Sequence, residues 1–135
     1  MNNPRYLHNI YCDDVRLEAN NKAIIIGVYN YDMIINSASQ RPIIQKLCVY
    51  STISTPVDKP IKEIKYKLKL DNKVIQEFSE NFNTPIQIGN ETFYIMHGAI
   101  INVTIPITQD SILRLCASID DEDEIQGAAL HIKFK

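Results

Sequence analysis

The sequence lacks the features that would assign it to a membrane or to a secretory route. No apolar run approaches the roughly 18 residues that a membrane-spanning helix needs, and the run 23–28 has only the length of a strand. Residues 1–8 contain neither the apolar stretch nor the small-residue cleavage site of a secretory signal. We therefore expect a cytoplasmic protein with no membrane partner.

An excess of one charge is also missing. The 14 Lys and Arg residues are balanced by 16 Asp and Glu residues, and the formal net charge of -2 supplies no field for holding a polyanion. Only four glycines occur, none of them in a phosphate-binding loop, and His8, His97 and His131 lie outside any catalytic motif. These absences disfavour nucleic-acid binding, leave an enzymatic activity without support and imply no cofactor.

Cysteine pairs are absent as well. Cys12, Cys48 and Cys116 are odd in number and widely spaced, and no Cys-x-x-Cys is present to hold a metal. Each lies in apolar, strand-like sequence, where a reduced and buried thiol is common. We interpret all three as small core residues, with an isolated reactive thiol as the alternative.

What the sequence does contain is a repeated alternation of apolar and polar residues with period two, which is typical of strands with one wet face. The segment 101–107 alternates in this way. It includes Pro106, which cannot donate to a β-ladder and so predicts an edge strand or a bulge. The segments 113–119 and 130–135 alternate too and predict a hairpin whose loop is the acidic run 120–124.

Further strands are predicted in the middle and near the start of the chain. The alternating residues 65–70 and 74–78 flank Asp71-Asn72, which has turn chemistry, and predict a second hairpin. The apolar runs 23–29, preceded by a turn at 20–22, and 47–53 are continuous enough to predict strands buried on both faces. The polar connections are interpreted as loops; they are 36–42, 55–60 and 81–90.

These patterns define the expected fold. The chain of 135 residues is 45% hydrophobic and 22% charged, which suits one globular domain with a buried core. No segment carries a helical apolar stripe over three turns, and eight or nine short strands follow at roughly even spacing. We predict an all-β, predominantly antiparallel β-sandwich formed by a single domain, residues 1–135.

The most unusual polar segment lies near the start of the chain. In a strand over residues 11–19, alternate side chains point to opposite faces: Cys12, Asp14, Arg16 and Glu18 on one, and Asp13, Val15, Leu17 and Ala19 on the other. Asp13 and Asp14 therefore cannot both ligate one metal from a regular strand.

This alternation gives the two aspartates different expected roles. Asp13 falls among apolar neighbours, where a carboxylate needs a partner. A bond to backbone N–H groups in a bend is favoured over a role as a catalytic acid or base. Asp14, Arg16 and Glu18 form a ladder of alternating charge, which is either a solvated face with weak ion pairs or a binding or catalytic cluster.

Two further charged segments are weaker candidates. The acidic run could recruit calcium, although it lacks the spacing of an EF-hand and is also typical of a soluble hairpin tip; it comprises Asp120, Asp121, Glu122, Asp123 and Glu124. A basic face formed by Lys65, Lys67 and Lys69 could touch phosphates. No aromatic residue shares that face, so protection of an exposed strand against aggregation is favoured over nucleic-acid binding.

The opening segment also carries a resemblance. Cys12-Asp13-Asp14-Val15-Arg16-x-Glu18, followed by Ile26-Gly27-Val28-Tyr29 and Lys46-Leu47-Cys48-Val49, resembles an uncharacterised family of small, bacterial, β-sandwich-like proteins with a Cys-Asp-Asp-Val/Ile-Arg-x-Glu opening. The likeness covers roughly the first 70 residues. It implies a bacterial, cytoplasmic protein and no assigned activity. Family members carry more glycine where this chain has Ala19-Asn20-Asn21, so we expect a different turn here.

The sequence thus leads to two functional hypotheses. The first is a non-enzymatic protein-binding or structural module that docks through a sheet edge or loops, onto another protein or onto itself. The alternative is a small-ligand or metal-dependent activity centred on Asp13, Asp14, Arg16 and Glu18. A concave pocket around those side chains would favour the second hypothesis, and a flat wet face the first.

Overall fold

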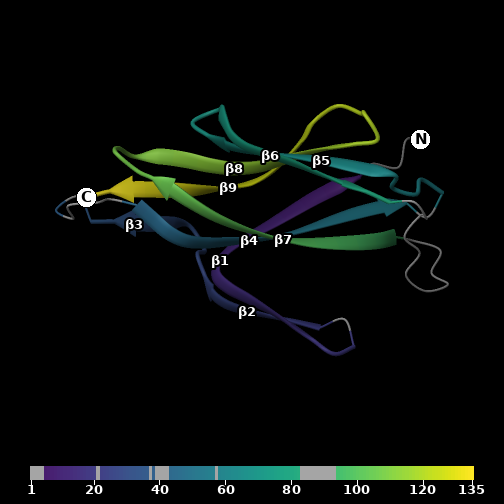
Figure 1. Ribbon diagram of the computed structural model, residues 1–135, viewed down its shortest axis with the longest axis horizontal. Coiled ribbons are helices and arrows are strands. Elements are labelled where there is room, and N and C mark those ends of the chain that lie inside the picture. The colour runs from purple at the N-terminus through teal and green to yellow at the C-terminus, as the bar shows by residue number, and fades with distance from the viewer. Residues whose placement is uncertain (1–4, 21, 37, 39–42, 57, 83–93) are drawn as a thin grey trace.

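The computed structural model describes residues 5–135 except 21, 37, 39–42, 57 and 83–93. Within this part of the chain, nine strands form two layers (Figure 1). The strands are β1 (Tyr6–Glu18), β2 (Lys22–Val28), β3 (Asp32–Ile35), β4 (Ile43–Pro56), β5 (Glu63–Leu70), β6 (Lys73–Asn81), β7 (Tyr94–Pro106), β8 (Ser111–Ile119) and β9 (Ile125–Phe134).

Each layer is one sheet. The first has the strand order β2-β1-β4-β7, and the second has the order β3-β9-β8-β5-β6. All pairs are antiparallel except β3 with β9. The predicted all-β, predominantly antiparallel sandwich is therefore confirmed. No helix among the described residues is long and apolar enough to span a membrane.

The core lies between the sheets and is filled by alternate residues of each strand. On β5, Ile64, Tyr66 and Leu68 are buried, whereas the lysines between them lie on the outer face. The Tyr66 ring stacks on Phe78 of β6 with its centroid 4.9 Å away. Each fully buried aliphatic side chain contributes roughly 1.5–3 kcal/mol. This burial fixes the register of β5, because a slip by one residue would turn its lysines into the core.

Both predicted hairpins are present. Strands β8 and β9 pair on either side of the acidic loop, and β5 pairs with β6 around Asp71 and Asn72. These two turn residues have φ angles of 50° and 67°, the left-handed region that Asp and Asn tolerate better than most residues. Pro106 is the last residue of β7, an edge strand, as its missing N–H predicts.

The predicted loops are confirmed only in part. The segment 36–42 lies largely outside the described residues, and so does most of 81–90. Strand β4 continues through Thr55 and Pro56, and β6 includes Asn81, so both strands are longer than predicted. The predicted turn at 20–22 lies one residue earlier, because Ala19 and Asn20 form the turn and Lys22 already belongs to β2.

The prediction that 23–29 is a strand buried on both faces is wrong. Strand β2 is an edge strand whose only described ladder is with β1, and its residues are exposed or half-buried. An apolar run indicates that its residues have a high β-propensity, but it does not indicate whether they are buried. Their burial depends on whether the facing sheet extends over them. The run 47–53 lies on β4 between β1 and β7. Five of its residues are buried, but Tyr50 and Thr52 are half-buried, so burial on both faces is confirmed only in part.

Candidate functional site

Strand β1 belongs to the sandwich in its first half and leaves it in its second half. Its ladder with β4 ends at the pair Cys12↔Cys48, whereas its ladder with β2 continues to Glu18↔Lys22. From Asp13 onward, β1 and β2 therefore form a two-stranded extension, which we call the β1–β2 ribbon (residues 13–20 and 22–28). Figure 1 shows this ribbon projecting away from the two layers.

The base of the ribbon is anchored to the opposite sheet by Tyr11. Its hydroxyl donates to the Ala128 carbonyl oxygen at 2.7 Å and accepts from the Leu115 N–H at 3.2 Å. Desolvation is the largest cause that raises the pKa of Tyr11 to about 12. The ribbon thus begins from a rigid point of the core.

Apolar side chains are exposed on both faces of the ribbon. The pairs Asp14↔Ile26 and Arg16↔Ile24 define one face, and Leu17 lies on the other. The exposed fractions are 73% for Leu17, 43% for Ile24, 39% for Ile26 and 47% for Val28. Single apolar residues on a protein surface are ordinary, but Ile24, Ile26 and Val28 are alternate residues on one face of the same strand, which is the kind of grouping that marks a site of interaction.

The charge ladder lies on the same face as Ile24 and Ile26. The Asp14 carboxylate is 3.4 Å from Lys46 Nζ and 3.7 Å from Arg16 Nε, and it also accepts from the Val15 N–H. Desolvation acts to raise the pKa of Asp14, but the hydrogen bond and charge of Lys46 outweigh it, so the pKa lies below its ordinary value. Asp14 is therefore a charged carboxylate at neutral pH.

Asp13 points to the other face, as the strand alternation predicts, but its environment is not the expected apolar one. The residue is exposed, and its carboxylate accepts a 2.6 Å hydrogen bond from the Tyr29 hydroxyl. To reach Tyr29 it crosses Gly27, where a Cβ atom would lie 2.1 Å from Asp13 Oδ2. Gly27 also has a φ of 68°, so only glycine suits this place. The partner of Asp13 is a side chain and not the predicted backbone bend.

The four residues of the polar cluster do not form a pocket. Asp13 is separated from Asp14, Arg16 and Glu18 by the plane of the ribbon, and Arg16 and Glu18 are exposed. Among side chains with described positions, no three His, Cys, Asp or Glu residues come together as metal ligands. No observation therefore favours the small-ligand or metal-dependent alternative at this place.

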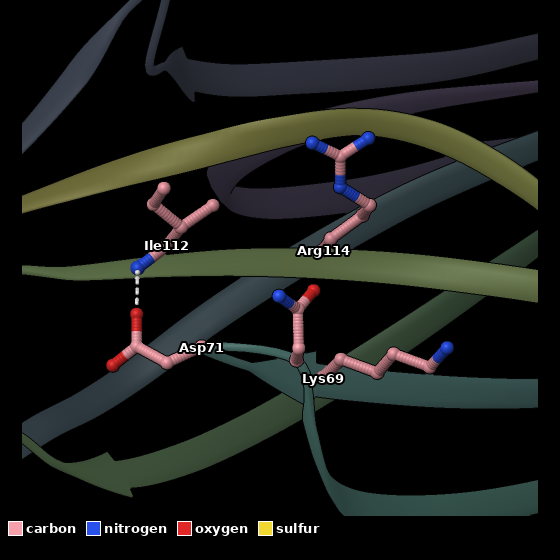
Figure 2. Close-up of a pocket in the computed structure, with 5 residues that line it drawn as sticks. Lys69, Asp71, Ile112 and Arg114 are labelled. Atoms are coloured by element: carbon pink, nitrogen blue, oxygen red, sulfur yellow. Dashed lines mark hydrogen bonds between the residues drawn. The ribbon is translucent and has the colours of Figure 1, made fainter.

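Two hollows of the described surface lie on the other sheet. One, of about 270 Å³, is lined by Lys69, Asp71, Asn72, Ile112 and Arg114. In Figure 2 the Arg114 guanidinium points toward β9, and the Lys69 amine points in a different direction from that guanidinium. The Asp71 carboxylate accepts a hydrogen bond from the Ile112 N–H at 2.9 Å. The second hollow lies over β5 and β6, beside Lys65 and Lys67. Neither hollow gathers groups with complementary catalytic roles.

The basic face and the acidic loop, which the sequence offers as separate candidates, face each other. Lys65 Nζ lies 3.0 Å from Asp121, and Lys69 is paired with Glu124. The hydrogen bond that each lysine ammonium donates to its carboxylate is the main cause that raises the pKa of that lysine. Lys67, between them, is half-buried and lines the second hollow. Two of the three lysines are thus engaged within the chain.

The acidic loop is organised by Arg5, a residue that the sequence patterns did not single out. Its guanidinium contacts Asp120 at 3.1 Å and Glu122 at 2.8 Å, and its Nε donates to Thr55 Oγ1 at 2.9 Å. Only 4% of the Arg5 side chain is exposed. Arg5 lies more than 100 positions away from the loop in the sequence and belongs to no motif, so no local signal could have identified it.

The cysteines are free and buried, as predicted for core residues. Cys12 and Cys48 lie opposite each other on β1 and β4. Burial, followed by the neighbouring Cys48 thiol, raises the pKa of Cys12 to about 11, and burial also raises that of Cys116. A thiol in this state is a poor nucleophile at neutral pH.

Comparison with known proteins adds no assignment to this geometry. The chain matches no protein-family model, and no curated protein aligns with it at significant similarity.

Proposed function

We propose that the chain is a non-enzymatic protein-binding module whose docking surface is the β1–β2 ribbon. The observation that carries this proposal is the exposure of Leu17, Ile24, Ile26 and Val28 on a projecting ribbon whose outer edge pairs with no other described strand. On the resemblance of residues 12–18 to the bacterial family, we place the module in the cytoplasm of a bacterium.

The free edge of β2 supports docking by strand addition. An edge strand presents unpaired N–H and C=O groups that a partner strand can pair with, and the side chains on its two faces then select the partner. Most edge strands are protected by charges, proline, bulges or short length. Within β2, the only charged residue is Lys22 at its first position.

The other edge strands of the described sheets are better protected. Strand β3 has only four residues, and β7 ends in Pro106. Strand β6 carries Lys73, Glu77 and Glu80. The least protected edge therefore coincides with the exposed apolar side chains of the ribbon.

The proposal is tested by site-specific photo-crosslinking in bacterial cells. A photo-crosslinking amino acid replaces Ile26 on the ribbon or, as a matched control, Ile112 on β8, which is 42% exposed on the other sheet. We expect protein adducts from position 26 and not from position 112. The absence of any adduct from position 26, or adducts from position 112 alone, would refute docking through the ribbon.

A further inference from the structure

We infer that the free edge of β2 pairs with β2 of a second copy of this chain, antiparallel, about a two-fold axis at Ile24. This inference rests on the proposed function and names the partner. It predicts a continuous four-stranded sheet in the order β1-β2-β2-β1 across the two copies.

The first argument is the thinness of the ribbon. Beyond Cys12, β1 has no described ladder except that with β2. A two-stranded hairpin is marginally stable in water, whereas a sheet of three or more strands with an apolar face is stable. Pairing two ribbons through their edges removes this weakness from both copies at once, and two-fold dimers are the commonest protein oligomers.

The second argument is the geometry of the edge, which selects one register. Residues directly opposite each other in a ladder have side chains on the same face, so a two-fold axis normal to the sheet must place one residue opposite itself. Gly27 has a φ of 68° and is covered by the Asp13 carboxylate, so regular pairing stops at Ile26. The regular stretch is then 22–26, and its centre is Ile24.

The third argument is the complementarity of the side chains in this register. Ile24 faces Ile24 of the second copy, and Lys22 faces its Ile26. Because Asp14 lies opposite Ile26 within each ribbon, the Lys22 ammonium is directed across one isoleucine toward the Asp14 carboxylate of the other copy. No like charges are directly opposed, and the apolar residues of β2 lie together at the centre. Lys22 near the tip of each ribbon thus lies on the same face as Asp14 near the base of the other.

Cysteine cross-linking tests both the dimer and its register. The three native cysteines are buried, so Ile24→Cys and Ile25→Cys each provide one accessible thiol. Under mild oxidation we expect a covalent dimer from Ile24→Cys and much less from Ile25→Cys, because residue 25 faces Ala23 of the second copy. Equal cross-linking of the two variants, or more from Ile25→Cys, would refute the register.

Sedimentation equilibrium tests the association itself. We expect the unmodified chain to show a concentration-dependent dimer. Ile24→Lys should weaken it at least tenfold, because it places two like charges opposite each other at the axis. Ile34→Lys, at a 66% exposed isoleucine on β3, is the matched control and should leave the dimer unchanged. Circular dichroism verifies that both variants are folded.

The outcomes separate this inference from the proposed function. A monomeric chain that still forms adducts from position 26 with a different protein would refute self-pairing and leave ribbon docking intact. A monomeric chain without adducts would refute both. A dimer that Ile34→Lys disrupts and Ile24→Lys does not would place the interface on β3 and also overturn the inference.

Discussion

Asn9 occupies the space that a side chain at Gly127 would need. A Cβ atom at position 127 would lie 2.1 Å from Asn9 Nδ2. Strand β9 bulges here, between the pairs Arg114↔Ala129 and Cys116↔Gln126, and Asn9 Nδ2 donates to the Leu115 carbonyl oxygen at 2.9 Å. The glycine thus admits an amide from β1 into the irregular part of the opposite sheet.

We predict from this relationship that Gly127→Ala destabilises the protein. The added methyl group must displace Asn9 or β9, and overpacking of this kind costs about 1–3 kcal/mol. Urea unfolding measures the loss. In an Asn9→Ala background the same substitution should cost much less, because the obstructing amide is gone. Additive costs in the double variant would contradict the proposed clash.

Arg5→Ala should be among the most damaging substitutions of a charged residue in this chain. Removal of the guanidinium leaves Asp120, Glu122 and Thr55 without their shared donor. Loss of one partner from a largely buried ion pair costs roughly 3 kcal/mol, which thermal or urea unfolding can measure.

Arg16→Ala is the matched control for that experiment. Arg16 also pairs with an aspartate, Asp14, but its side chain is 70% exposed. Exposed pairs of this kind contribute about 0–1 kcal/mol. If both arginine variants unfolded at the same urea concentration, the Arg5 contacts would not carry the stability that we assign to them.

Tyr29 should titrate at an unusually high pH. Burial, and then the hydrogen bond and charge of Asp13, raise the pKa of Tyr29 to about 12 from its ordinary value of 10.0. The unfolded chain therefore loses this proton first, and the free energy of unfolding falls as the pH rises from 10.0 to 12. Tyrosinate absorbance follows the titration, and Tyr29→Phe assigns it.

Asp13→Asn should lower the pKa of Tyr29, because the negative charge beside the phenol is removed. The pKa should stay above its ordinary value, since burial is the larger cause of the shift. Asp32→Asn, at an exposed aspartate of β3, is the control and should leave the Tyr29 titration unchanged. An unchanged titration in Asp13→Asn would show that Asp13 does not act on Tyr29.

We predict that millimolar calcium does not raise the melting temperature. Asp120 Oδ1 already accepts the N–H groups of Lys62 and Glu63, while Arg5 is paired with Glu122 and Lys69 with Glu124. A calcium ion would have to displace these partners. Sodium chloride at matched ionic strength is the control, and a rise specific to calcium would contradict this prediction.

Several parts of the fold could be predicted because they depend on neighbouring residues alone. Side chains in a strand alternate between its two faces. Ile64, Tyr66 and Leu68 therefore lie on one face of β5 and Lys65 and Lys67 on the other, independently of the rest of the chain. The same rule separates Asp13 from Asp14. Turn chemistry at Asp71 and Asn72 likewise depends on local backbone conformation.

The candidate site could be predicted only in outline. The residues of 13–18 were identified and their two faces were assigned correctly, but Tyr29 as the partner of Asp13 and Lys46 as a partner of Asp14 come from other strands. The apolar residues of β2 were assigned to the core, although they form the exposed surface on which the proposed function rests. An isoleucine has a high β-propensity whether it is buried or exposed, so the residue type alone does not indicate its solvent exposure.

The sequence by itself determined the all-β fold class, the alternation of side chains between the two faces of a strand, and the two hairpins, because each follows from local geometry. Only the tertiary structure decided which charged residues form ion pairs and which apolar residues are left exposed to solvent. Arg5 meets Asp120, and Lys69 meets Glu124, across separations of more than 50 residues. Beyond Cys12, where the β1–β4 ladder ends, β1 pairs only with β2 among the described strands, and the residues of β2 are exposed or half-buried. Such contacts arise from the packing of whole sheets, on which the spacing of residues along one strand carries no information.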